Sequence, residues 1–433
     1  MMRLILIFLL ITFYSKNAFA ISLSEALMQT YKNNLELNAE RENIEVSKEE
    51  LKISKSEFLP SITISGSKSE ENTEKLTNRS GTNATITDVN PKIKSIIIEQ
   101  TIFQGFAGIA SVNKNKIGLD LAEAKLLKIE QEILYKAIEA YSGLILANEK
   151  LAINQKNVNL SERQVETDQA RLERGQITLA DLAQSESSLA GAQAYFIQAK
   201  NEAVTAKLIY EEVVGPIVDS NSLDKNSNID FETPVNLNKA IEISKNNNPE
   251  VLIAKLEYDQ SEKDVIIARS DLAPSATLSL NSTETDDLSA TYDERDKETI
   301  TATISWPIFK GGKNTASLNK SKSLKNRKKL LFENAIRSND TNVASAWSSL
   351  QSSKSLLESV KSQVKAAEIA NEGITLEYES GLGRSTLDVI QSNSILLNSK
   401  ISLANSERSY LLAQFKLLQA IGLLKSDYLK LKQ

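Results

Sequence analysis

Apolar residues recur at three- and four-residue spacing along two long stretches of the chain, residues 106–174 and 313–380. This spacing is typical of one face of an α-helix. Neither stretch contains a proline, and each predicts a helix of roughly seventy residues, which would extend for roughly 100 Å. The first stretch carries two apolar stripes, so we expect its helix to pack against a neighbour on each side. The stripes consist of Leu119, Ala122, Leu126, Ile129, Ile133, Ala140, Leu144, Ala147 and Leu151, and of Ile138, Tyr141, Ile145 and Ile153. Such helices can close into a cylinder, and a simple coiled-coil rod is the alternative.

A glycine ends each long helical stretch, at Gly175 and Gly381, and a second helical pattern returns over residues 177–214 and 385–424. The sequences around the two glycines are similar, LERGQITLADLAQ and YESGLGRSTLDVIQ. Their offset, 381 − 175 = 206, also relates a Phe-Gln-Gly sequence to a Phe-Lys-Gly sequence farther upstream. The chain therefore consists of two tandem repeats of one unit.

The repeat divides the chain into two halves. We expect residues 21–215 to form the first repeat and residues 236–433 the second, joined by the polar linker 216–235. Each repeat begins with a helical pattern, over residues 22–58 or 237–272, that ends before a proline. Asparagine-rich breaks inside both patterns predict a short turn between two helices.

The hydrophobic period changes from 3.6 to 2 in two segments of each repeat. These segments are apolar on one side and small and polar on the other, as transmembrane strands of an outer-membrane β-barrel are. A half-buried antiparallel sheet of a soluble protein shares this alternation and is the alternative. The predicted strands are about 60–69, 92–103, 274–283 and 298–309.

Two further features favour the barrel. The loops within the strand pairs, residues 70–90 and 283–297, are long and polar, as the outer loops of such barrels are. Four strands are too few to close a barrel, so we expect several copies of the chain to share one. Two copies would give eight strands with a filled interior, whereas three would give twelve and leave a lumen. The predicted fold class is mainly α, with long helices and a small transmembrane β part.

The N-terminus has the pattern of an export signal, which predicts that residues 1–20 are removed. Arg3 is followed by an apolar run over residues 4–14 and by Ala18-Phe19-Ala20, an A-x-A cleavage site. A membrane anchor is the alternative, but the run is shorter than the roughly 20 residues that a spanning helix needs.

Composition narrows the chemistry. The 433 residues include no histidine and no cysteine, which removes imidazole bases, thiolate nucleophiles, disulfides and the usual zinc ligands. We find no phosphate-binding glycine loop and no nucleophile with a base, so we predict no catalytic residue, cofactor or metal site. An enzyme would have to work with carboxylates and lysines alone. The pI near 5.4 argues against nucleic acid as a partner.

The order helix, strand, strand, long helix, glycine turn and return helix, written twice after a signal peptide, resembles the TolC family of outer-membrane efflux and type I secretion proteins. The resemblance covers the whole mature chain. The most specific matches lie in Gly383–Gly422 and include Thr386-Leu387-Asp388-Val389, Leu403-Ala404-Asn405-Ser406 and Ala420-Ile421-Gly422. The resemblance implies a homotrimer with a twelve-stranded barrel in the outer-membrane lipid and a helical tunnel across the periplasm. It also implies docking on an inner-membrane transporter through a periplasmic adaptor.

The resemblance further implies a gate at the periplasmic tip, near the hairpin-tip glycines Gly175 and Gly381. Polar links between hairpins hold the tip closed in the family, and here Arg384 and Tyr378 would link to Asp181. Asp388 from three subunits would form an acidic ring. This chain has Gln391 where the family has a second ring acid one helical turn later, so the ion selectivity stays open. The gate residues would therefore be Asp181, Tyr378, Arg384, Asp388 and Gln391.

Each of these residues also has a structural explanation. An acid just after a turn is stabilised by the helix dipole, which accounts for Asp181 and Asp388 without any gate. Arg384 can be a solvated surface residue. At the strand ends, Phe103, Trp306 and Phe309 are expected to form an interfacial aromatic belt, with ordinary packing as the alternative. A basic cluster is expected to be a solvated helix face, with contact to anionic head groups as the alternative: Lys320, Lys322, Lys325, Arg327, Lys328 and Lys329.

The favoured hypothesis is a passive export channel in the outer membrane whose cargo is chosen by the partner transporter. The alternative from another class is a periplasmic coiled-coil scaffold or adaptor that forms no pore.

Overall fold

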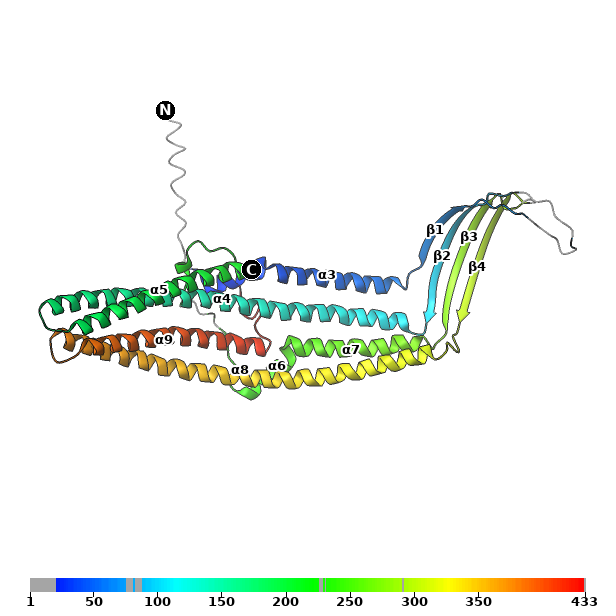
Figure 1. The fold of residues 1–433 in the computed structure, drawn as a ribbon. Helices are drawn as coiled ribbons and strands as arrows, with labels where there is room; N and C mark the ends of the chain where they lie inside the picture. Colours follow the sequence, from blue (N-terminus) through cyan, green and yellow to red (C-terminus); the bar gives the residue numbers. More distant parts are fainter. Residues whose placement is uncertain are drawn as a thin grey trace, which may run out of the picture. The chain divides into compact units, whose positions relative to one another are not determined.

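The computed structural model of the chain describes residues 21–74, 81, 88–225, 229, 231–289 and 292–431 (Figure 1). The predicted signal peptide, residues 1–20, lies outside the described residues. The described part of the chain is mainly helical and has one four-stranded antiparallel sheet, as the sequence predicts. In chain order the elements are α2 (Leu23–Asn33), α3 (Leu35–Ser56), β1 (Ser61–Lys68), β2 (Lys92–Gln104), α4 (Ala107–Glu173), α5 (Leu179–Val213), η1 (Ser220–Ser222), α6 (Leu237–Asn247), α7 (Pro249–Ser270), β3 (Ser275–Asp286), β4 (Glu294–Ser305), α8 (Lys313–Glu379) and α9 (Thr386–Ala420).

Among the described residues, each half has two short helices, two strands, a long helix and a return helix, in that order. The expected breaks lie at Asn34, between α2 and α3, and at Asn248, between α6 and α7. The second break has a clear cause: the ring of Pro249 disfavours helical backbone in the residue before it, and Asn248 is extended, with φ −68° and ψ 121°.

The chain forms two compact units. We call the first the hairpin unit, which comprises Met1–Glu40, Lys125–Val251 and Ile336–Gln433. The second is the sheet unit, which comprises Arg41–Ala124 and Leu252–Ala335. The division falls within α4 and α8, so each long helix contributes residues to both units.

The sheet unit contains the four strands in the order β1-β2-β3-β4, with every neighbouring pair antiparallel. A register shift between Thr101 and Phe103 marks an irregularity in β2. The last strand ends at Ser305 rather than near residue 309, because Pro307 has no N–H with which to continue the hydrogen-bonding pattern. The sheet is therefore open, with β1 and β4 as its edges.

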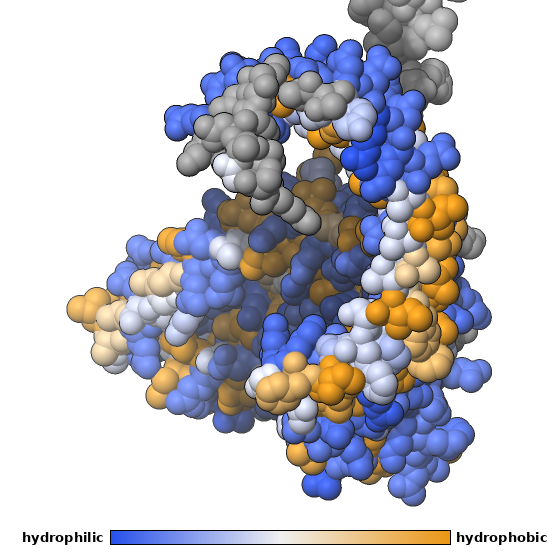
Figure 2. All heavy atoms as spheres, turned by 90° about the vertical axis from the view of Figure 1, so that its right-hand side faces the viewer, coloured by the Kyte–Doolittle hydropathy of each residue, from blue (hydrophilic) through white to orange (hydrophobic). Residues whose placement is uncertain are grey.

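The two faces of the sheet differ sharply in polarity, and Figure 2 shows the apolar side chains gathered on one of them. The register places Ile64 opposite Ile96, and Leu280 between Ile98 and Ile300. The side chains of Ile64, Ile300 and Ile304 are about three-quarters exposed, at 76%, 73% and 78%. The opposite face carries mostly serine and threonine: Thr63, Ser65, Ser95, Thr277, Ser279, Thr299, Thr301 and Thr303. Exposed isoleucines in a contiguous row indicate a surface that another phase or molecule covers.

Four helical segments of the sheet unit lie in the order α3, α4, α7, α8 (Figure 1). The ring of Phe58, just after α3, lies against Gly108 of α4, because a Cβ added to this glycine would lie 3.0 Å from the ring. An ion pair of 2.7 Å joins Lys114 of α4 to Asp264 of α7, and another of 2.6 Å joins Lys328 of α8 to Glu257 of α7. Helices α3 and α8 therefore form the two outer members of this row.

The hydrophobic core of the hairpin unit surrounds α4 and α9. Its largest fully buried side chains include Tyr141, Tyr210 and Phe415. The hydroxyl of Tyr141 donates to the backbone oxygens of Ile21 and Asp224, so the start of the first repeat and the linker are both fastened to α4.

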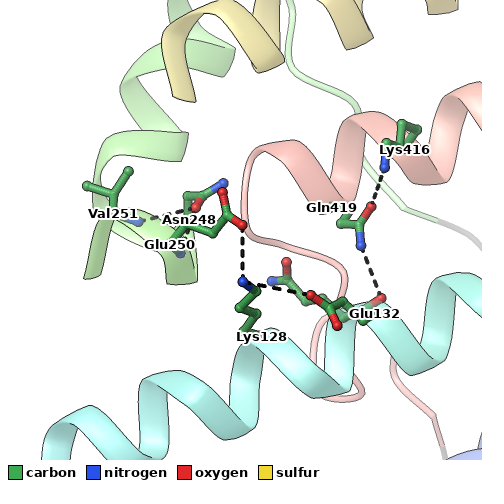
Figure 3. Close-up of polar contacts among 8 residues, drawn as sticks. Lys128, Glu132, Asn248, Glu250, Val251, Lys416 and Gln419 are labelled. Carbon is green, nitrogen blue, oxygen red and sulfur yellow. Dashed lines mark hydrogen bonds and ion pairs between the residues drawn. The ribbon is translucent and has the colours of Figure 1, made fainter. Parts of the chain in front are cut away.

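The break at Asn248, near the start of the second repeat, contacts the end of α9, near the end of the same repeat (Figure 3). Its side-chain oxygen accepts from the backbone N–H of Glu250, at 2.9 Å, and its Nδ2 donates to the carbonyl of Ala420 at the end of α9. Glu250 also forms an ion pair of 3.3 Å with Lys128 of α4. Gly422 has a left-handed backbone (φ +79°), and an added Cβ would lie 2.2 Å from the carbonyl oxygen of Asn247. Only glycine fits this junction.

Candidate functional site

The two helical hairpins of the hairpin unit turn at glycines. Gly175 connects α4 to α5, and Gly381 and Gly383 connect α8 to α9. Their φ angles are +70°, +74° and +83°, a left-handed conformation that is costly for residues with a Cβ. An added Cβ would meet no atom within 4 Å at any of the three, so backbone conformation rather than space requires glycine here.

A capping box starts each return helix. The hydroxyl of Thr178 accepts from the backbone N–H of Asp181, at 3.3 Å, and the Asp181 carboxylate accepts from the Thr178 backbone N–H, at 2.9 Å. Ser385 and Asp388 form the same pair of bonds at the start of α9, at 3.2 and 2.9 Å. The hydroxyls of Thr178 and Ser385 also donate to these carboxylates, at 2.7 and 2.9 Å. The bond that each carboxylate accepts from the backbone, followed by the bond that it accepts from the hydroxyl, lowers the pKa of both carboxyl groups. Both acids are thus ionised helix caps within one chain.

Arg384 and Gln391 lie on the surface. Arg384 Nε forms an ion pair of 2.6 Å with Glu377 in the last turn of α8, and both side chains are exposed. Gln391 is exposed and lies three residues after Asp388, so the two share one face of α9. An exposed ion pair of this kind contributes little to stability.

Tyr378, by contrast, is buried at the centre of a polar cluster. Its hydroxyl donates a short hydrogen bond to the carboxylate of Asp168, which is fully buried, and lies 3.0 Å from the hydroxyl of Thr386. Ser185 donates a second short bond to Asp168. Gln164 Nε2 lies 3.0 Å from both oxygens of the same carboxylate. The buried charge therefore has three side-chain donors, which is what makes its burial tolerable.

Arg171 covers the tyrosine in this cluster. Its guanidinium lies 4.0 Å from the centre of the Tyr378 ring, and its Nη2 donates to the Tyr378 carbonyl at 2.9 Å. A cation over an aromatic face is attracted by the ring, more strongly where water is excluded. Arg171 thus adds a second attachment between α4 and α8, independent of the Asp168 carboxylate.

We call Asp168, Arg171, Ser185, Tyr378 and Thr386 the latch cluster. Its members come from α4, α5, α8 and α9, so it ties the two hairpins of one protomer together near their turns. Burial, followed by the hydrogen bond to Asp168, raises the pKa of the Tyr378 hydroxyl above its usual range. The phenol therefore stays protonated and remains a donor at neutral pH.

The structure gives the predicted gate residues partners other than those that the resemblance implies. Among the described residues, Asp181 bonds to Thr178, Arg384 to Glu377, and Tyr378 to Asp168 and Thr386. No bond within the described chain joins Asp181 to Tyr378 or to Arg384. A link between neighbouring copies stays a prediction.

Sequence reasoning missed Asp168, although the sequence held a signal. The apolar seam of α4 continues at three- and four-residue spacing through Leu151, Asn154, Val158, Ser161, Val165, Asp168 and Leu172. A carboxylate at a seam position of a long helix must be paired or must face water. Asp168 was therefore recognisable as a carboxylate that needs hydrogen-bond donors when the seam is buried.

The predicted belt aromatics lie at the base of the sheet. Trp306 and Phe309 follow β4 and are 61% and 83% exposed, and the indole N–H of Trp306 donates to the carbonyl of Leu272. Phe103 in β2 packs edge-on against Phe106, with the ring centres 5.4 Å apart. An exposed indole and an exposed phenyl ring next to the apolar face suit an interface between lipid and water.

Within the part of the chain that the structure describes, no group of three or more acidic, histidine or cysteine side chains is placed to hold a metal ion. None of the described helices combines the length and the apolar character that crossing a membrane requires.

Comparison with known proteins places these features in context. A family model described as "Outer membrane efflux protein" matches residues 26–209 and 240–423, one segment in each repeat. The outer membrane efflux protein BepC of Brucella suis is 27% identical over 412 residues, which cover 95% of this chain and 87% of BepC. The outer membrane protein TolC of Escherichia coli is 21% identical over 424 residues, which cover 94% of this chain and 84% of TolC.

Among solved structures, that of the outer membrane protein VceC from Vibrio cholerae superposes with a TM-score of 0.79. The superposition covers 92% of this chain and 96% of VceC, at 17% sequence identity. At this identity the likeness concerns the fold.

Proposed function

Because the chain belongs to the outer membrane efflux protein family, we propose that three copies form a passive channel-tunnel that is gated at its periplasmic tip. The protein is located in the outer membrane. The family and the similar structures are transport channels, and we propose no catalytic residue, cofactor or metal for this chain.

The open sheet with its exposed apolar face is the observation that carries the proposal. Strands β1 and β4 present unpaired edges, and the isoleucine row lies on the face that lipid would cover. A sheet in lipid cannot leave backbone groups unpaired, so β4 of one copy must pair with β1 of the next until the ring closes. Three copies give twelve strands, enough for a barrel with a lumen. The serine and threonine face then lines the water-filled interior.

The latch cluster supports a gate at the hairpin turns. Opening such a tip requires the two hairpins to move relative to each other, which would separate Tyr378 of α8 from Asp168 of α4. We propose that the latch cluster holds each protomer closed. Arg384 and Asp181 would make the links between copies, and Asp388 would form the acidic ring. With Gln391 one turn later, this ring has a single layer of acids.

The energy for transport would come from an inner-membrane transporter that docks on the tunnel through a periplasmic adaptor. The channel itself then needs only to open, so it can serve small molecules or proteins alike. The choice of cargo belongs to the transporter.

Conductance in planar lipid bilayers tests the proposal. Purified protein should insert as a trimer and give small, stable channels, and Arg384→Ala or Asp181→Ala should raise the single-channel conductance. Unchanged conductance in both variants would remove these residues from the gate. Release of the protein from cells by mild osmotic shock, without channel activity, would favour the periplasmic scaffold and contradict the channel.

A further inference from the structure

Resting on the proposed ring of copies, we propose that an acidic seam on α3 of one copy pairs with a basic seam on α8 of the next. The acidic seam consists of Glu42, Val46, Glu49 and Ile53. The basic seam consists of Lys320, Leu324, Arg327 and Leu331. Both lie in the sheet unit.

The acidic seam is an apolar line with acids along one side. Val46 and Ile53 are seven residues apart and 54% and 65% exposed. Glu42 and Glu49 each precede one of them by four residues, so each acid lies one helical turn from its apolar neighbour on the same face. Two lysines of this helix, Lys48 and Lys55, fall on the other side of the helix, and Lys52 borders the seam, three residues after Glu49. Glu49 bonds to Lys52 at 2.7 Å, but both side chains are more than half exposed, and such pairs are weak.

The basic seam repeats this pattern with the opposite charge. Leu324 and Leu331 are seven residues apart and 47% and 41% exposed. Lys320 and Arg327 each precede one of them by four residues. Neither base forms an ion pair with any residue that the structure describes. The lysines that do pair with α7, Lys325 with Glu262 and Lys328 with Glu257, belong to the neighbouring face of the helix.

The two seams lie where adjacent copies would meet. Helices α3 and α8 are the outer members of the row in the sheet unit, and α3 leads into the edge strand β1 while α8 follows the edge strand β4. A ring that joins β4 of one copy to β1 of the next therefore also brings α8 of the first copy next to α3 of the second. Because α3 runs towards the sheet and α8 away from it, the two helices meet antiparallel.

The charges lie equally far, in residues, from the sheet-side ends of the two helices. Glu49 lies seven residues before the sheet-side end of α3 at Ser56 (56 − 49 = 7), and Lys320 lies seven residues after the start of α8 at Lys313 (320 − 313 = 7). Glu42 and Arg327 each lie seven residues farther, about 10 Å along the helix. In the antiparallel pair Glu49 therefore faces Lys320 and Glu42 faces Arg327 at once, with Val46 and Leu324 between the two charge pairs. Like charges on the two seams would instead oppose assembly.

Charge reversal tests the pairing. Glu42→Lys/Glu49→Lys and Lys320→Glu/Arg327→Glu each place like charges across the interface. We expect each double variant to weaken trimer association by at least about tenfold, measured by light scattering in detergent. The variant that combines all four substitutions restores opposite charges and should return to within about threefold of the wild type. In the wild type, trimer association should weaken when the salt is raised to about 1 M.

Lys322→Glu/Lys329→Glu is the matched control, since it reverses two exposed lysines seven residues apart on the other side of α8. It should leave the trimer unchanged. Circular dichroism checks that every variant keeps its helices. If the wild type forms conducting trimers and every variant does so equally well, the charge pairing is wrong and the channel proposal stands. The pairing is also wrong if the fourfold variant dissociates as readily as the double variants. If the wild type forms no ring of copies, both proposals fall.

Discussion

The hydroxyl of Tyr378 donates a hydrogen bond to the carboxylate of Asp168, although the two residues are 210 positions apart and belong to different repeats. Both side chains are buried, and Ser185, Gln164 and Arg171 complete their surroundings. This contact joins the two hairpins of one protomer at the end where both turn. Any motion that separates the hairpins must break it.

Replacing this tyrosine should loosen the tip. Tyr378→Phe keeps the ring under Arg171 but removes one of the three side-chain donors to the buried Asp168 carboxylate, at a cost of about 1–3 kcal/mol to the closed state. The closed-to-open ratio should fall by roughly 5- to 150-fold. Single-channel conductance in planar bilayers should rise accordingly. Tyr195→Phe, at an exposed position of α5, is the control and should conduct like the wild type.

The same contact predicts a response to alkaline pH. The pKa of Tyr378 in the folded protein lies above the usual value of 10.0, chiefly because of burial and then because of the hydrogen bond to Asp168. The stabilising contribution is therefore complete below pH 10.0 and is lost as the pH rises through the folded-state pKa. Wild-type conductance should rise in this range, and Tyr378→Phe should lack that rise. An equal rise in both would show that another group controls it.

The capping acids predict a response at low pH. The pKa of Asp181 in the folded protein lies below the usual value of 3.8, because its carboxylate accepts from the Thr178 backbone and hydroxyl. Its contribution is present above pH 3.8 and is lost as the pH falls through the folded-state pKa. Asp181→Ala should therefore melt at a lower temperature than the wild type at pH 7, followed by circular dichroism. The difference should disappear in strong acid. Glu186→Ala, in the same helix and exposed, should melt like the wild type at both pH values.

The polarity of the sheet faces predicts a contrast between adjacent residues. Ile300→Lys places a charge on the apolar face, where lipid would cost about 2–4 kcal/mol per copy near the bilayer centre. Thr301→Lys places the same charge on the opposite face, which is expected to line water. We expect the first variant to be depleted from outer-membrane fractions and the second to be retained. Equal retention of both would contradict a lipid-facing isoleucine row.

The contact between Gly422, just after α9, and the break between α6 and α7 predicts that one added methyl group has a large effect on stability. Gly422→Ala forces a left-handed alanine and a contact of 2.2 Å with the carbonyl of Asn247, so we expect a loss of roughly 2–4 kcal/mol in unfolding free energy. Gly373→Ala is the control. Gly373 lies within α8 with no atom near its Cβ position, where alanine should stabilise the helix by about 0.5–1 kcal/mol. Urea unfolding of both variants compares them directly.

Much of the architecture followed from local sequence patterns. The helical period, the glycine turns and the alternation of period 2 predicted long helices and a small sheet, and the structure has both. The family resemblance, which rests on the turn sequences and the repeat, is confirmed by the family match. Such features depend on residues close together in the chain, so one sequence is enough to reveal them. The strand ends were less accurate, because Pro307 stops the hydrogen bonding of β4 before the apolar alternation ends.

The partners of individual side chains were decided by the tertiary structure alone. The sequence by itself identified Tyr378 and Asp181 as polar residues near the turns, but Asp181 caps its own helix and Tyr378 bonds to Asp168, in a helix that enters the other turn. Which donors reach a buried carboxylate depends on how two helices 210 residues apart are rotated about their axes. That rotation is set by the packing of whole helical faces, and the spacing of residues along one helix carries no record of it.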